Sequence, residues 1–79
     1  MTVGERLRYW RERRAFSQRE LAAAAEVAQN TIWRTENGQV VPHPATLRKL
    51  AAALGLRVDQ LTAVDPPRPD QQPEAAALP

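Results

Sequence analysis

The sequence predicts an all-α fold, a compact bundle of five helices in residues 1–64 followed by a tail over residues 65–79. Two capping boxes of the form Ser/Thr-x-x-Glu, at 2–5 and 17–20, mark helix starts. Apolar residues recur at the three- and four-residue spacing of an amphipathic helix. Proline and glycine stand between these periodic segments, where chain reversals are expected.

The first two helices are expected to follow the capping boxes. A helix from Val3 to about Arg14 would direct Val3, Leu7 and Trp10 inward. Phe16 then precedes the Ser17 cap in the position of a hydrophobic staple. The second helix follows this cap and carries one apolar side, formed by Leu21, Ala22 and Ala25. The small Ala22 would allow two helix backbones to cross closely.

The third helix is predicted to have two chemically different sides. At 100° per residue from Gln29, the residues that cluster inward are Ala28, Ile32, Thr35 and Glu36, and those that fan outward are Gln29, Asn30, Trp33, Arg34 and Asn37. Amide and guanidinium groups can pair bidentately with adenine or guanine edges in a major groove. We therefore interpret residues 17–38 as a DNA-binding helix-turn-helix rather than as an ordinary solvated helix surface.

The remaining elements complete the bundle. A proline-containing loop follows Gly38, and Pro44 suits the first turn of a fourth helix. That helix would bury Leu47, Leu50, Ala51 and Leu54 and end at Gly55 in a left-handed cap. A short helix from about Val58 to Ala63 would direct Val58 and Leu61 into the core. The proline-rich tail from Asp65 is expected to be disordered, with a handle for a partner as the alternative.

Composition favours one small cytoplasmic domain. The chain has 79 residues, 43% of them hydrophobic, and no cysteine for a disulfide or a thiolate metal site. It contains neither the apolar core of a signal peptide nor a membrane-spanning segment. Residues 65–79 carry one arginine and three acidic residues, so the net charge of +2 becomes +4 for residues 1–64. Ten of the eleven basic residues are arginine, which suits a polyanionic partner.

Catalysis is not expected. His43, the only histidine, lies between two prolines at the expected cap of the fourth helix, so it is interpreted as a cap or an exposed ring. Ser17, the only serine, is explained by its capping box. The three glycines are isolated and form no phosphate-binding loop. We predict no enzyme activity, no metal and no cofactor.

The chain resembles the Cro/C1-type (Xre) helix-turn-helix family of bacterial and phage regulators. The resemblance covers roughly residues 7–61 and rests on matches in one order: Leu7, Trp10, Arg11, Phe16, Ser17, Gln18, Leu21, Ala22, Val27, Thr31, Ile32, Glu36, Gly38, Pro42, Thr46, Leu47, Leu50, Ala51, Ala53, Leu54 and Gly55. It implies a lambda-repressor-like domain whose third helix enters the major groove, with Gln18, Gln29, Asn30 and Arg34 in base or backbone contact. It also implies that Arg11 pairs with Glu36.

Four positions depart from the family pattern. Glu26 replaces the usual glycine in the turn, so the turn is either strained or built differently. Ala28 replaces a serine cap that stabilises a helix by about 0.5–2 kcal/mol. Thr35 is polar where an aliphatic residue is usual. Trp33 adds an indole that could contact a thymine methyl, cover the DNA backbone, anchor a protein, or lean back over the second helix.

The resulting functional prediction is a sequence-specific transcriptional regulator, most simply a repressor that occupies an operator. The residues expected at double-stranded DNA are Gln18, Ala28, Gln29, Asn30, Thr31, Trp33, Arg34 and Asn37. A homodimer on a near-palindromic operator is expected, with candidate contacts at Val40, Val41, Leu61 and Val64. The alternative is a protein-interaction module or antitoxin-like subunit that keeps the fold and needs a partner protein.

Overall fold

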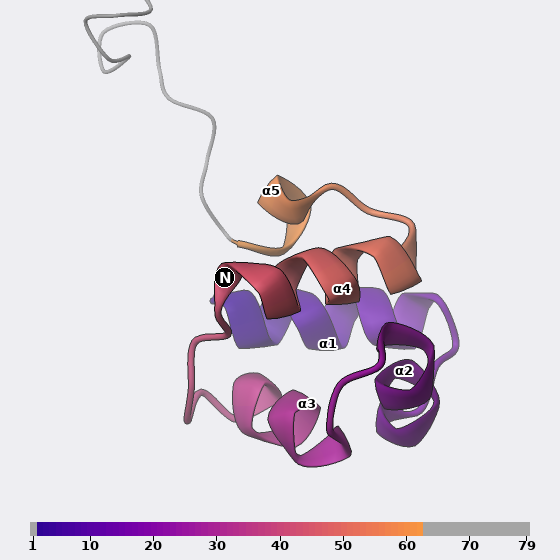
Figure 1. The fold of residues 1–79 in the computed structure, drawn as a ribbon, viewed down its shortest axis with the longest axis horizontal. Coiled ribbons are helices and arrows are strands. Elements are labelled where there is room, and N and C mark those ends of the chain that lie inside the picture. The colour runs from indigo at the N-terminus through magenta and orange to yellow at the C-terminus, as the bar shows by residue number, and fades with distance from the viewer. Residues whose placement is uncertain (1, 63–79) are drawn as a thin grey trace, which may run out of the picture.

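Five helices make up residues 2–62, the part of the chain that this computed structural model describes (Figure 1). They are α1 (Val3–Arg13), α2 (Gln18–Ala25), α3 (Gln29–Glu36), α4 (Pro44–Leu54) and α5 (Val58–Leu61). The all-α prediction is confirmed. The first helix ends one residue earlier than expected, and α5 ends at Leu61 rather than at position 63, which is outside the described residues together with the predicted tail.

Both predicted capping boxes are formed. The backbone N–H of Glu5 donates to Thr2 Oγ1 (3.1 Å), and the N–H of Thr2 donates to Glu5 Oε1 (2.9 Å). Ser17 and Glu20 repeat this exchange at the start of α2, with both bonds at 2.9 Å. The backbone hydrogen bonds lower the pKa of both glutamates, because they stabilise the ionised carboxylate. These local interactions determine where α1 and α2 begin.

The core is built from one apolar side of each helix. Leu7, Leu21, Ile32, Leu50 and Leu61 are fully buried, one from each of the five helices. The α2 helix packs against both α3 and α4, whereas α1 packs against α3 and α5. Figure 1 accordingly shows α2 and α3 together at one end of the bundle and α5 at the other. Across the described residues, no helix has the length and apolar content that crossing a membrane requires.

The end of α5 is not available for contact between two copies at Leu61. We expected Leu61 and Val64 to contribute to a dimer, and for Leu61 this is wrong, because its side chain has no exposed surface. Burying leucine in its own core uses the apolar area that an interface would need. Val64 lies outside the described residues.

Arg14 connects the ends of α1 and α4. Its Nε donates to the carbonyl oxygen of Leu54 (3.0 Å), one of the last carbonyls of α4 that has no partner within the helix. The guanidinium also lies 5.1 Å from the centroid of the Trp10 ring. Part of the basic charge of α1 is therefore structural.

Candidate nucleic-acid interface

Of the two alternatives for the turn that leads into α3, the strained one is correct. Glu26 adopts a left-handed conformation with φ +57° and ψ +46°. Ala28 is the N-cap of α3 and provides no side-chain hydrogen bond. The expectation that Ala28 points inward is wrong, because its side chain is exposed. As a cap it has extended backbone angles (φ −68°, ψ +140°), so a helical projection does not apply to it.

Within α3 the predicted division into two sides is confirmed. Ile32 and Thr35 are buried, and the Thr35 hydroxyl donates to the carbonyl oxygen of Thr31 (2.7 Å). This bond satisfies a hydroxyl group inside the core. The outward residues Gln29, Asn30, Trp33, Arg34 and Asn37 are all exposed.

An ion pair attaches the end of α3 to α1. Arg11 Nε donates to Glu36 Oε2 (2.6 Å), Arg11 Nη2 donates to Glu36 Oε1 (3.0 Å), and Arg11 Nη1 donates to the carbonyl oxygen of Phe16 (2.8 Å). The two side chains are only 11% and 2% exposed. Hydrogen bonding to the Glu36 carboxylate raises the pKa of Arg11 above its ordinary value. The pair implied by the family resemblance is therefore present, in bidentate form.

Gln18 joins this ion pair to the outward side of α3. Its Nε2 donates to Glu36 Oε1 (3.1 Å), a contact that sequence reasoning missed. An ionised carboxylate only accepts hydrogen bonds, so the amide nitrogen of Gln18 must face Glu36. No local sequence pattern indicates this bond, because 18 residues separate its two partners.

The candidate DNA-binding residues are distributed over two open hollows. Gln18, Gln29, Asn30 and Trp33 line the first, which we call the amide hollow. Thr31 and Arg34 belong to the second, described below. Asn37 follows the last residue of α3 and is partly engaged, because its Nδ2 donates to the carbonyl oxygen of Trp33 (2.8 Å).

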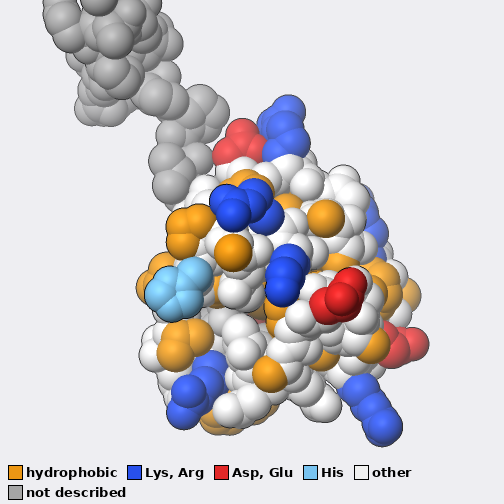
Figure 2. Space-filling view, in the orientation of Figure 1, with side chains coloured by type: hydrophobic (Ala, Val, Ile, Leu, Met, Phe, Trp, Pro, Cys, Tyr) orange, Lys and Arg blue, Asp and Glu red, His pale blue; other side chains and the backbone are white. Residues whose placement is uncertain are grey.

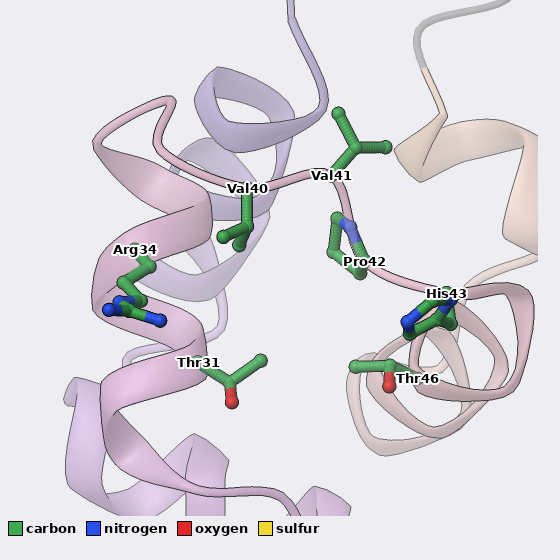
Figure 3. Close-up of a pocket in the computed structure, with 7 residues that line it drawn as sticks. All are labelled: Thr31, Arg34, Val40, Val41, Pro42, His43 and Thr46. Carbon is green, nitrogen blue, oxygen red and sulfur yellow. The ribbon is translucent and has the colours of Figure 1, made fainter.

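The second hollow lies between α3 and the start of α4, and we call it the loop hollow (Figure 3). It is lined by Thr31, Arg34, Val40, Val41, Pro42, His43 and Thr46. In Figure 3 the side chains of Thr31 and Thr46 point toward one another across it, whereas Val41 points away. Val40 is 37% exposed and Val41 80% exposed. The sequence identified both valines but gave no indication that they line one hollow with Arg34.

His43 is the N-cap of α4 and is exposed, with no side-chain capping bond. Of the two interpretations of this histidine, the exposed ring is therefore the correct one.

On the face shown in Figure 2, basic side chains are spread out rather than collected in one patch. Figure 2 shows them over several parts of one face, separated by uncharged side chains, with fewer acidic groups between them. Some are paired, as in Arg8–Glu12 (3.7 Å) and Arg57–Asp59 (3.1 Å). Both pairs are largely exposed and contribute little to stability.

Comparison with known proteins gives consistent matches. A family described as "Helix-turn-helix domain" matches residues 2–64. The HTH-type transcriptional repressor RghR of Bacillus subtilis (strain 168) is 44% identical over 61 residues, which are 76% of this chain and 45% of RghR. The chain thus spans about half the length of this curated relative.

Two solved structures share the fold at 28% and 30% sequence identity. The P22 c2 repressor, crystallised with a synthetic operator, has a TM-score of 0.76 and 28% identity, covering 82% of this chain and 98% of the repressor. The restriction-modification controller protein C.AhdI from Aeromonas hydrophila has a TM-score of 0.72 and 30% identity, covering 75% of this chain and 89% of C.AhdI.

Proposed function

The chain belongs to the Xre-type (Cro/C1-type) helix-turn-helix family, and from this premise we propose that it is a sequence-specific DNA-binding transcriptional regulator. It acts as a repressor by occupying an operator. The observation that carries this proposal is the two-sidedness of α3, whose Ile32 and Thr35 are buried while its amides and Arg34 are exposed. A helix held by its buried side and exposing such groups suits insertion into a major groove.

The exposed residues of α3 take different roles in this proposal. Gln29, Asn30 and Arg34 read base edges, because amides match adenine and guanidinium matches guanine. Gln18, Ala28, Thr31 and Asn37 surround them, and contacts from this group to the DNA backbone set the register of the helix. Trp33 also lies at this surface, as an apolar side chain among polar ones. The match to RghR, itself a transcriptional repressor by name, supports the proposed function of a DNA-binding regulator, as does the structural likeness to an operator-bound repressor.

The test is a selection of bound sequences from random DNA, followed by affinity measurements on the enriched operator. Replacing Gln29, Asn30 and Arg34 together by alanine should abolish the selection of a sequence. Each lost base contact should reduce the binding free energy by about 1–3 kcal/mol. Arg57→Ala is the matched control, because it removes an equal charge at the start of α5, at the opposite end of the bundle from α3 (Figure 1). A triple variant that still selects the same operator would disprove the assignment.

We further propose that two copies bind one near-palindromic operator. A single short helix reads few base pairs, and a twofold pair would place two such helices about 34 Å apart, one turn of DNA. Val40 and Val41 are the candidate contacts, since both are exposed. Native mass spectrometry of the complex should give two chains per operator. One chain per site, with half-sites bound as tightly as whole sites, would argue against the dimer.

The second candidate function is a protein-interaction module or antitoxin-like subunit. The exposed apolar side chains of Trp33 (44%) and Val41 (80%) favour it, because such groups anchor protein interfaces. Binding to generic DNA across a salt series separates the two functions. A DNA-binding regulator binds at low salt and weakens as salt rises through counterion release, whereas an interaction module shows no such binding.

A further inference from the structure

Trp33 is a large apolar side chain on the otherwise polar outer side of α3. Its exposed fraction is 44%, close to the 45% of Tyr9 on α1. The Tyr9 ring contacts its own neighbours, with the Trp10 ring at 5.1 Å in an edge-to-face arrangement and the Arg13 guanidinium 5.8 Å from its centroid. Trp33 instead lines the amide hollow with Gln18, Gln29 and Asn30. The indole therefore contributes an apolar wall to a surface whose other members are amides.

None of the residues described at the amide hollow carries a formal charge. In the described part of the chain its lining consists of three amides and an indole, and Arg34, the arginine of α3, lines the loop hollow instead. Arginine, lysine and sets of backbone N–H groups hold phosphate most strongly, so this uncharged lining should bind phosphate more weakly than Arg34 in the loop hollow. It suits a neutral partner that offers hydrogen-bond donors and acceptors beside an apolar group.

The A·T base pair offers that combination in the major groove. Adenine presents its N7 acceptor and N6 donor to an amide, and thymine presents its C5 methyl group beside them. The G·C pair has no methyl group and presents the acceptors that arginine reads best. Gln29 and Trp33 are one helical turn apart, so an amide and the indole can face neighbouring positions along one groove.

We propose that Trp33 makes this side of α3 selective for A·T pairs by packing its indole against a thymine methyl group. The proposal rests on the DNA-binding function proposed above and adds the chemical group that is recognised. Gln29 and Asn30 read the adenine edge, and Trp33 covers the methyl group and excludes water from it. Arg34 lies on the loop-hollow side, so it does not contribute to this selectivity for A·T pairs.

The test removes single methyl groups from the DNA and leaves every hydrogen bond in place. Each thymine of the selected operator is replaced in turn by deoxyuridine, and the dissociation constant of the full chain is measured. At one thymine position in each half-site, replacement by deoxyuridine should weaken binding about fourfold, which is the effect of losing one buried methyl group. In Trp33→Ala that thymine should lose its effect, while Tyr9→Ala, the matched exposed aromatic, should behave as the unmodified protein. Trp33→Gln gives a second measurement should the alanine variant unfold.

The outcomes separate this inference from the function on which it rests. An operator bound equally well with and without every thymine methyl would overturn the role of Trp33 but leave DNA reading intact. Equal sensitivity in the unmodified protein and in both Trp33 variants would overturn it as well, and the indole would then be free for a protein partner. A chain that selects no DNA sequence would overturn both proposals.

Discussion

Gly4, in the first turn of α1, packs directly on the backbone of Thr35 near the end of α3. A Cβ atom added at Gly4 would overlap the carbonyl oxygen of Thr35 and lie 3.1 Å from the Cα of Glu36. Both neighbours are backbone atoms, which cannot rotate out of the way as a flexible side chain can. The close approach of α1 and α3 therefore requires glycine at this position.

Gly4→Ala should destabilise the fold. In an unhindered helix this substitution stabilises by about 0.5–1 kcal/mol, whereas forcing a methyl group into the α1–α3 contact should cost about 1–3 kcal/mol. The free energy of unfolding in urea measures the difference. Gly55→Ala is the control, because nothing lies within 4 Å of an added Cβ there and only the strain of φ +71° remains. A more stable Gly4→Ala variant would mean that the two helices are farther apart.

The Arg11–Glu36 pair should behave as one unit. Arg11→Met and Glu36→Met each leave a nearly buried charge without its partner. Such a loss lowers the free energy of unfolding by about 3–5 kcal/mol when burial is complete. The double variant removes both charges and should lose less stability than either single variant. A double-mutant cycle of unfolding free energies measures the coupling. Additive losses would show that the two side chains act independently.

Glycine should relieve backbone strain in two turns. Ala15 and Glu26 both have a positive φ, +61° and +57°, in a region that residues with a Cβ rarely adopt. Ala15→Gly and Glu26→Gly should each stabilise the folded chain by about 0.5–1 kcal/mol. The backbone strain that glycine removes from the folded state should outweigh the conformational freedom that it adds to the unfolded chain. Ala52→Gly, in the body of α4, is the opposite control and should destabilise. Thermal unfolding followed by circular dichroism is sufficient for the comparison.

Stability should decrease as the pH falls through the titration of the capping glutamates. The folded state lowers the pKa of Glu5 and Glu20, so the unfolded chain binds protons first as the pH falls past its glutamate pKa of about 4.3. The stabilisation is present above that pH and is lost as the pH falls through the lower folded pKa. In Glu5→Gln/Glu20→Gln, melting temperatures should depend less on pH between about 3 and 5. An unchanged slope would mean that other groups control acid unfolding.

Local chemistry explains why most of the fold could be predicted from the sequence. A capping box, a proline in the first turn or a glycine after the last turn acts within a few residues, so the starts of α1 and α2 and the left-handed end of α4 at Gly55 were foreseen. The division of α3 into two sides also follows from its own periodicity. The family resemblance added the Arg11–Glu36 pair.

Contacts between distant segments could not be predicted in the same way. The packing of Gly4 on Thr35 depends on how closely two helix axes approach, and glycine in a helix does not by itself indicate such an approach. The same applies to the Gln18–Glu36 bond and to the hollow that Val40 and Arg34 both line. Leu61 was expected in the core and also as a dimer contact, because a short terminal helix offers too few residues to determine which side is buried, and only the core prediction is correct.

The attachment of α3 to α1 affects the entropy of binding. A helix of eight residues is marginal on its own in water, so α3 depends on its packing against α1 and α2, with Gly4 and Arg11 at its last turn. Its conformational freedom is already lost when the chain folds, before any ligand arrives. Docking of α3 as a preformed rigid element then adds little further ordering, and the heat capacity change of binding would reflect only the surface that the two partners bury.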